Sequence, residues 1–315
     1  MPTQGQYGKA FEFALINEAN NLFTGKFKIN IVQDATYNIA LACYNLFPVR
    51  SQARYSAAAV AALTHIVLLE PRLVNPQNAT ELLTLQLQPD SVGRLGDVRD
   101  ILFIRSSQNW EIGISAKNNH KALKHSRLSD IKDFGLSWLG VPCSPGYWAA
   151  ISPVFKQLAK LRDKGEKWKN LPNKHAAYYR PVLDAFMNEL ILINASNPGI
   201  PQKLISYLVG NNDFFKVMKR AKIVEILAFN LKKSLGKSAG SIRSITTLPK
   251  LALPTQIIRF QMRPGSTDTL EMVCDKGWQL SFRIHSAETD VAASLKFDVN
   301  LIGQPVSMYA HNIPY

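Results

Sequence analysis

Cysteine is scarce in this sequence. The three cysteines, Cys43, Cys143 and Cys274, lie far apart in a chain of 315 residues. A disulfide framework needs paired cysteines, and a structural zinc site needs cysteines and histidines at short, regular spacings. The sequence therefore excludes a disulfide-stabilised scaffold and offers no zinc motif. It predicts a protein of a reducing compartment, the cytoplasm.

Long hydrophobic runs are also missing. The best apolar stretch lies in residues 56–70 and is ended by Glu70 and Pro71, before it reaches the length of about 20 residues that a transmembrane helix needs. The first residues, MPTQGQYGKAFEF, lack the basic start and apolar run of a signal peptide. We therefore expect no membrane segment and no secretion signal.

Negative charge is in short supply. The chain has 23 Asp and Glu against 37 Lys and Arg, which gives a formal net charge of +14. Such an excess attracts polyanions, nucleic acid first and an anionic membrane surface second. Hydrophobic residues make up 46% and charged residues 19%, so we expect a folded chain with one large domain or two moderate ones.

The N-terminal half mixes helical patterns with one hairpin pattern. Residues 8–23 carry a helical stripe of apolar residues, and residues 56–70 form an alanine-rich helix. Residues 76–95 are typical of a polar helix and loop. Two β-rich runs, DILFIR and WEIGISAK, are separated by SSQN, which predicts a β-hairpin. Residues 120–140 suggest a basic helix followed by a glycine-broken loop.

Changes in hydrophobic periodicity and composition along the chain predict three regions. Residues 1–150 contain the hairpin, residues 151–240 are expected to be mainly helical, and residues 241–315 are rich in strand patterns. The Ser, Gly and Lys-rich stretch 232–241 is a candidate boundary or exposed loop. We therefore expect a mixed α and β protein with a β-rich C-terminal part.

The hairpin places an acid next to a lysine. With the turn near Ser107, Asp100 falls opposite Ser115, and Ser115 and Lys117 share one face because side chains alternate along a strand. A carboxylate binds a hard cation such as magnesium, which activates water and neutralises a phosphate. A lysine can position that water or stabilise the developing charge. Asp100 and Lys117 are therefore candidates for a metal-dependent phosphodiesterase site, although acids and lysines also decorate ordinary exposed strands.

Other charged residues near the hairpin have two interpretations each. Asp97 is a second candidate acid or a turn cap, and Glu12, between Phe11 and Phe13, is a site residue or a solvated helix glutamate. The stretch after the hairpin supplies contacts to DNA phosphates or is only a solvated basic helix. Its candidate DNA-binding residues are Asn118, Lys121, Lys124, His125 and Arg127.

These segments resemble the PD-(D/E)XK nuclease superfamily and, within it, type II restriction endonucleases of the HaeIII family. GKAFEFAL is similar to the first helix, GDVRDILFI to the strand with the essential aspartate, and WEIGISAKNNH to the strand with the catalytic lysine. The longer stretch RIHSAETDVAASLKFDVNLIGQP carries the most specific similarity. The resemblance covers roughly residues 8 to 302. It implies a central mixed sheet flanked by helices, a helical insertion and a β-rich C-terminal DNA-recognition part.

The resemblance also implies site residues. It assigns catalytic positions to Asp100, Lys117 and Glu12, with Asp97 as the second choice for the aspartate. The chain departs from the pattern at Ser115, where the superfamily has Asp or Glu. The substitute acid is expected to be Glu12, then Glu111, and Asp130 and Asp133 are further candidates on the expected helix after the lysine. Asp100, Glu12 and Glu111 are thus the candidate magnesium ligands.

The family implies double-stranded DNA and the palindrome GGCC, cut between G and C to blunt ends. A palindrome favours a twofold homodimer, and a DNA methyltransferase is implied as a functional partner in the bacterial cell. Arginines suit guanine recognition, and Arg243, Arg259, Arg263 and Arg283 are available. Ser294 and Lys296 are further candidate DNA contacts, or else part of an exposed strand.

Other functions fit the sequence less well. A repair or structure-specific nuclease of the same superfamily and a non-catalytic basic DNA-binding protein both stay open. NNHKALKH places His120 and His125 near asparagines, as in HNH nucleases, but those need a histidine on a strand and both are expected in a helix. GKSAGS does not have the spacing of a phosphate-binding P-loop, and GIS is not a nucleophile elbow.

Overall fold

The chain folds into two units that alternate along the sequence. The computed structural model describes residues 2–94, 96–119, 121–286 and 289–315. The first unit comprises residues 1–121, 211–251 and 307–315, and the second comprises residues 122–210 and 252–306. Because the chain leaves and re-enters each unit, neither coincides with the expected consecutive regions 1–150, 151–240 and 241–315.

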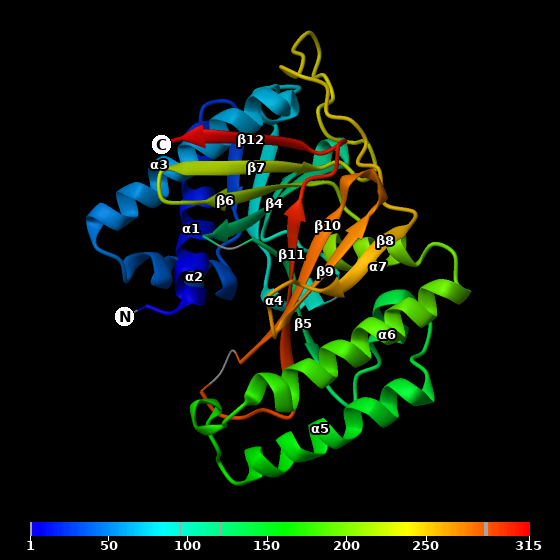
Figure 1. Ribbon diagram of the computed structural model, residues 1–315. Helices are drawn as coiled ribbons and strands as arrows, with labels where there is room; N and C mark the ends of the chain where they lie inside the picture. Colours follow the sequence, from blue (N-terminus) through cyan, green and yellow to red (C-terminus); the bar gives the residue numbers. More distant parts are fainter. Residues whose placement is uncertain (1, 95, 120, 287–288) are drawn as a thin grey trace. The chain divides into compact units, whose positions relative to one another are not determined.

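A seven-stranded mixed sheet forms the centre of the first unit (Figure 1). Its strand order is β1-β2-β3-β4-β6-β7-β12, with parallel pairing of β1 to β2 and of β4 to β6 and antiparallel pairing elsewhere. The strands are β1 (Lys28–Ile31), β2 (Leu82–Leu87), β3 (Ile101–Arg105), β4 (Trp110–Asn118), β6 (Phe214–Lys219), β7 (Ile223–Phe229) and β12 (Tyr309–Pro314).

Three long helices pack with this sheet and enclose one apolar core. The helices are α1 (Gln4–Phe23), α2 (Ala35–Asn45) and α3 (Val49–Leu69), with a short α4 (Asp90–Arg94). A capping box of Thr3 and Gln6 starts α1, so its first amide groups are satisfied. The apolar stripe of α1 then packs against α2, α3 and β4. This packing fixes the side chains of α1 relative to the hairpin strands.

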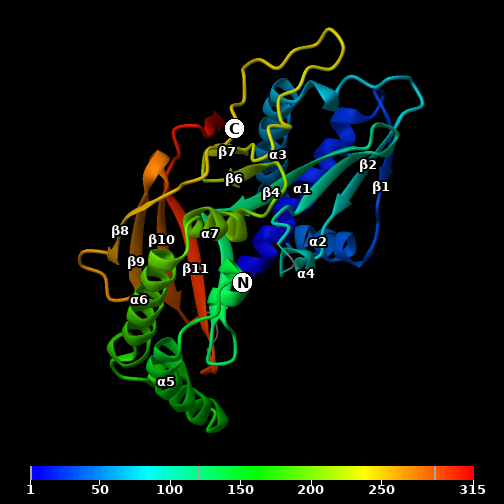
Figure 2. The same ribbon diagram turned by 90° about the vertical axis from the view of Figure 1, so that its right-hand side faces the viewer.

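The second unit contains a five-stranded antiparallel sheet (Figure 2). Its strand order is β5-β11-β10-β9-β8. Phe186 lies in a helix packed on one face of this sheet, where it contacts Phe260, Phe282 and Phe297. The strands are β5 (Ala122–Leu128), β8 (Ile257–Met262), β9 (Thr269–Cys274), β10 (Gln279–His285) and β11 (Leu295–Gly303).

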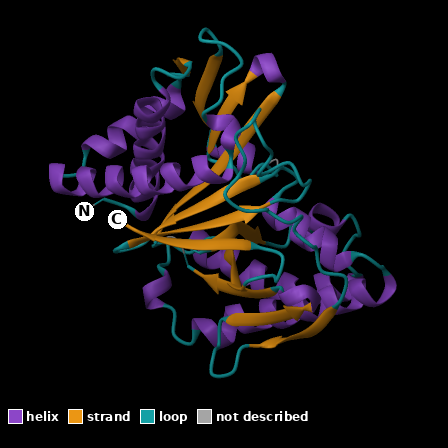
Figure 3. Ribbon diagram, turned by 90° about the horizontal axis from the view of Figure 1, so that it is seen from above, coloured by secondary structure: helices purple, strands orange, loops and turns teal. Residues whose placement is uncertain are grey.

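Most of the remaining helical segments belong to the second unit. Figure 3 shows the helices of the chain in purple and the strands in orange. Phe186 belongs to α6 (Arg180–Ser196), which packs against α5 (Pro145–Asp163) and α7 (Ile200–Val209). Across both units, the short segments are η1 (Pro71–Leu73), η2 (Ser106–Gln108), η3 (Gly135–Leu139), η4 (Trp168–Asn170), η5 (His175–Tyr179) and η6 (Asp275–Gly277). Among the described residues, no helix is long and apolar enough to cross a membrane.

Several sequence predictions are confirmed. The helical patterns at 8–23 and 56–70 lie within α1 and α3, and the predicted hairpin is β3 and β4. The range 241–315, predicted to be rich in strands, contains β8 to β12. The mixed α and β class, with a central mixed sheet flanked by helices and a β-rich C-terminal part, is therefore correct.

Two predictions of secondary structure are wrong, and a third is incomplete. The expected basic helix after the hairpin begins with strand β5, which pairs with β11. Residues Phe214–Lys219 and Ile223–Phe229 form β6 and β7 inside the range 151–240, which was expected to be mainly helical. The polar range 76–95 contains β2. In each case the strand is stabilised by a partner far away in sequence, a contact that local periodicity does not report.

Candidate active site

The β3–β4 hairpin has the register that the sequence predicts. Ile101 pairs with Ile114, and the backbone N–H of Asp100 donates to the carbonyl of Ile114 at 2.8 Å. Asp100 therefore lies opposite Ser115, directly before β3 begins. Ser115 and Lys117 follow each other at a spacing of two on β4, so they lie on the same face as Asp100.

One carboxylate oxygen of Asp100 collects three donors from β4. Its Oδ2 accepts hydrogen bonds from Ser115 Oγ at 3.2 Å, the backbone N–H of Ala116 at 2.7 Å and Lys117 Nζ at 2.9 Å. Within the described part of the chain, no hydrogen bond reaches Oδ1. Asp100 is thus held in place through Oδ2 alone.

Glu12 brings a second carboxylate to this site from α1. The residue is 5% exposed, and Lys9 Nζ bonds both to Glu12 Oε2 at 2.9 Å and to Asp90 at 2.8 Å. Burial and then the charge of Asp100 raise the pKa of Glu12 to about 7, against the opposing charges of Lys9 and Lys117. Glu12, Asp100 and Lys117 therefore interact as one electrostatic cluster, and Glu12 is not a solvated helix residue.

Lys117 is a stable cation in this cluster. Burial alone would lower its pKa, but the charge and hydrogen bond of Asp100 and the charge of Glu12 outweigh that effect and raise the pKa of Lys117 above its ordinary value. A protonated lysine whose position is fixed by a carboxylate can donate to a phosphate oxygen or to a water molecule.

Lys216 is a site residue that the sequence did not reveal. It pairs with Ser115 across the parallel β4–β6 ladder, is 2% exposed and donates from Nζ to the carbonyl of Lys121 at 3.0 Å. Burial and then the charge of Lys117 lower the pKa of Lys216 to about 7. A lysine within the apolar run FFKVMK was the available signal, but that run was expected to be helical.

Asp97 and Glu111 are held by a different cation. Arg99 bonds Asp97 Oδ2 and Glu111 Oε1, each at 2.6 Å, and the backbone N–H of Arg99 also donates to Asp97. Glu111 stands six positions before Lys117, about 20 Å along an extended strand. The structure thus brings Glu12, and not Glu111, together with Asp100 and Lys117. Asp97 has the geometry of a cap and ion-pair partner.

The absence of a side chain at Gly113 makes room for Arg99, which binds Asp97 and Glu111. A Cβ at Gly113 would lie 2.1 Å from Cδ of Arg99. We expect Gly113→Ala to displace the Arg99 stem and lower the free energy of unfolding by about 1–3 kcal/mol. Gly8→Ala on α1, where a Cβ meets nothing within 4 Å, is the matched control and should not destabilise. Chemical denaturation of both variants tests this, and equal stabilities would refute the role of Gly113.

The other two candidate acids lie in the second unit. Asp130 and Asp133 follow strand β5 rather than lying on a helix. The carboxylate of Asp133 accepts hydrogen bonds from the backbone N–H groups of Leu136 and Cys143, at 2.8 Å and 3.1 Å. This carboxylate therefore fixes the loop that leads into α5.

The predicted DNA contacts separate into three groups. Asn118 and Lys121 end the hairpin segment in the first unit: Lys121 is exposed, whereas Asn118 is 7% exposed and its buried Oδ1 has no hydrogen-bond partner. Lys124 lies on the apolar side of the second sheet, where it donates to the Tyr207 carbonyl at 3.1 Å. The remaining four lie together on β5, β11 and the residue before β11: His125, Arg127, Ser294 and Lys296.

The location of His125 also corrects the reason for setting aside an HNH nuclease. His125 lies on strand β5 and not in a helix, and His120 lies outside the described residues. In the structure, however, His125 Nδ1 is engaged by the carboxylate of Asp298, which also contacts His285 at 3.3 Å. The residue is therefore part of a sheet-surface ion cluster.

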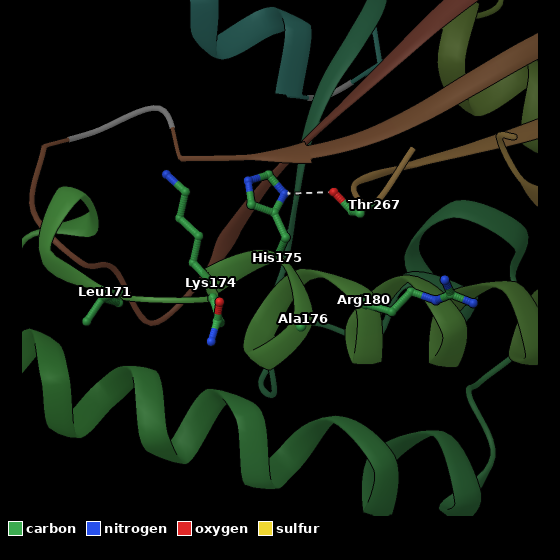
Figure 4. Close-up of a pocket in the computed structure, with 7 residues that line it drawn as sticks. Leu171, Lys174, His175, Ala176, Arg180 and Thr267 are labelled. Atoms are coloured by element: carbon green, nitrogen blue, oxygen red, sulfur yellow. Dashed lines mark hydrogen bonds between the residues drawn. The ribbon is translucent and has the colours of Figure 1, made fainter. Parts of the chain in front are cut away.

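A cavity of 560 Å³ lies in the second unit, but it contains none of the predicted site residues (Figure 4). Leu171, Lys174, His175, Arg180 and Thr267 are among its lining residues, and Thr267 Oγ1 lies 3.3 Å from His175 Nδ1.

In the described ranges, no three His, Cys, Asp or Glu side chains converge as a complete metal site. Any metal at Asp100 and Glu12 therefore needs water or substrate oxygens as further ligands.

Comparison with known proteins gives one consistent result. The family model described as HaeIII restriction endonuclease matches residues 8–305. The type II restriction enzyme HaeIII of Haemophilus aegyptius is 38% identical over 311 residues, which cover 98% of this chain and 97% of that enzyme. No solved structure matches the chain. Asp100, Lys117 and Glu12 all lie within the matched range.

Proposed function

The chain belongs to the HaeIII restriction endonuclease family and is a type II site-specific deoxyribonuclease, and we propose that it cuts GGCC between G and C using magnesium. Double-stranded DNA is its substrate. The observation that carries the proposed chemistry is the cluster of Asp100, Lys117 and Glu12, in which Asp100 and Lys117 lie on one face of the β3–β4 hairpin.

The two carboxylates suit a magnesium ion. Mg²⁺ is usually bound through one or two carboxylates together with several waters and substrate phosphate oxygens. Asp100 offers Oδ1, and Glu12 lies close enough for the charge of Asp100 to raise its pKa. A cation held by both would offset that repulsion. When bound, magnesium supplies positive charge for the phosphate and lowers the pKa of a coordinated water.

Lys117 and Ser115 have distinct roles in this proposal. Lys117 Nζ, fixed 2.9 Å from Asp100, donates to a non-bridging phosphate oxygen or orients the attacking water. Ser115 donates to Asp100 Oδ2 and so holds the aspartate rather than acting as a missing metal ligand. Glu12 supplies the second negative charge that an acid at position 115 would have provided. Lys216 fixes the backbone at Lys121, just after this strand.

The symmetry of the proposed target has consequences for assembly and biology. A palindrome is read symmetrically by a twofold dimer, so we propose a homodimer on DNA. Cleavage at a short site would damage the host chromosome, so a methyltransferase that modifies the same site is the expected functional partner. We place both activities in the bacterial cytoplasm, where the DNA is.

Digestion of a sequenced plasmid with magnesium, followed by mapping of the fragment ends, tests this function. We expect discrete fragments whose blunt ends all fall within GGCC, and no cutting of a plasmid methylated at that sequence. Fragments with uniform ends at another sequence would refute the GGCC assignment. Scattered ends would instead favour a repair or structure-specific nuclease of the same superfamily.

A further inference from the structure

One face of the five-stranded sheet is cationic. Side chains alternate along a strand, so the face opposite to Phe260, Phe282 and Phe297 carries the intervening residues. Since α6 packs on the phenylalanine side, the cationic face is not covered by that helix. We define the cationic face by Arg127, Arg263, Arg283 and Lys296, with His125 and His285 on the same side of the sheet.

The long cations of this face extend into solvent. The side chains of Arg263 and Arg283 are each 56% exposed, and that of His125 is 42% exposed. The shorter neighbours Thr269 and Ser281 are buried between the strands. The surface therefore offers guanidinium groups on a rigid sheet, which is a platform that holds their positions better than a loop would.

Carboxylates fix the direction of these cations. Arg263 Nε lies 3.3 Å from Glu271, and Arg283 Nε lies 3.4 Å from Asp268. Asp298 is shared by His125, His285 at 3.3 Å and Lys296 at 3.9 Å. Arg127 Nη1 donates to Ser294 Oγ at 2.9 Å, so the predicted contact Ser294 also belongs to this network. Oriented cations and largely buried carboxylates, whose side chains are only 12–19% exposed, thus alternate across the sheet.

This alternation fits the edges of G·C base pairs. Guanine presents two acceptors, O6 and N7, to the paired donors of an arginine, and cytosine presents its N4 amino group to a carboxylate. Arg263 with Glu271, and Arg283 with Asp268, each supply a donor fork next to an acceptor. A target that contains only G·C pairs needs this combination at every step.

We propose that the cationic face binds the DNA duplex and that Arg263 and Arg283 determine specificity for guanine in its target. This inference rests on the proposed function and names the surface that recognises the substrate. By strand alternation Arg259 on β8 lies on the same face as Arg263, whereas Arg243 belongs to the first unit. Two-stranded and sheet surfaces are an established way to enter a DNA groove.

Equilibrium binding to two duplexes tests the proposal. The metal is chelated to prevent cutting, and one duplex contains GGCC while the other has the same composition with that sequence scrambled. We expect Arg283→Ala and Arg263→Ala each to weaken binding to the GGCC duplex about tenfold or more, with a much smaller change on the scrambled one. Arg283→Lys keeps the charge but loses the planar fork, so it should lose specificity as well.

A matched control variant and a separate digestion distinguish a wrong recognition surface from a wrong recognition sequence. Arg180→Ala removes an exposed arginine of the same unit, one that pairs with Asp184 at 2.7 Å on α6, and should bind both duplexes like the wild type. The proposal would be overturned if Arg263→Ala and Arg283→Ala bound the GGCC duplex with full affinity. It would also be overturned if both variants lost affinity equally for the two duplexes and Arg283→Lys restored binding, because the arginines would then act only through their charge. A changed oligomeric state with intact DNA binding would also overturn it. Wild-type plasmid digestion is scored separately, so failure of the GGCC assignment is recognised on its own.

Discussion

Lys117→Ala is expected to reduce the single-turnover rate of DNA cleavage by about 10²–10³-fold or more, because it removes the fixed cation at the developing charge. The Lys117 ammonium is bound to Asp100 Oδ2 and is only 25% exposed. Its place cannot be taken by a mobile surface lysine. Asp100→Asn should cause a comparable loss, since it removes the charge that holds Lys117 and the oxygen offered to a metal. Cleavage of a supercoiled plasmid with enzyme in excess measures both rates.

The matched control for this variant is Lys28→Ala. Lys28 is an exposed lysine on β1, in the same sheet, and no hydrogen bond of its side chain connects it to Asp100. It should cut at the wild-type rate, and all three variants should melt near the wild-type temperature. If Lys117→Ala and Asp100→Asn are folded and still cut at near wild-type rates, the assignment of the site is wrong. A binding-only role for the basic surface would then be favoured.

Glu12→Gln is expected to reduce cleavage by about 10²-fold or more, whereas Glu111→Gln should stay within a few-fold of wild type. Glu12 is the buried carboxylate whose charge acts on Asp100 and Lys117, while Glu111 is 44% exposed and bound to Arg99. The two variants therefore decide which acid replaces the one missing at Ser115. The reverse result, with Glu111→Gln inactive and Glu12→Gln active, would assign that role to Glu111.

Glu12→Gln should also change how the stability of the protein depends on pH. The pKa of Glu12 rises from its ordinary 4.5 to about 7, through burial first and Asp100 second, so between those values the folded state retains a proton that the unfolded state releases. This contribution is fully present below pH 4.5 and is lost as pH rises through 7. Without metal, the free energy of unfolding of the wild type should fall by up to about 3 kcal/mol through this group as the pH rises from 5 to 8. Glu12→Gln has no carboxylate to titrate, so it should not show this fall. Denaturant titrations at pH 5 and pH 8 in a chelator test it.

The parts of the site that depend on local sequence were predictable. Asp100, the SSQN turn and Lys117 lie within 18 consecutive residues, so alternation and turn chemistry determine their register. The helix that carries Glu12 was equally clear, but its helical position left open whether the glutamate was solvated. Only the resemblance to the family assigned Glu12 to the active site. The structure adds that it is buried next to charges from two other elements.

The parts that depend on distant partners were not predictable. Lys216 reaches the site because β6 pairs with β4 across about a hundred residues, and the apolar run around it has no period that distinguishes strand from helix. β5 carries three basic residues, a pattern typical of a solvated helix, and becomes a strand only because β11 hydrogen-bonds to it. For the same reason, the contact between Arg127 and Ser294 could not be inferred from spacing.

A double-mutant cycle between Asp100 and Glu12 tests the central claim, that residues from the hairpin and α1 form one active site. Single-turnover cleavage is measured for Asp100→Asn, Glu12→Gln and the double variant. Groups that act as one unit give strongly non-additive losses. We expect the double variant to cut about as slowly as the slower single variant. A loss equal to the product of the two single losses would mean that Asp100 and Glu12 act independently, and it would contradict this site.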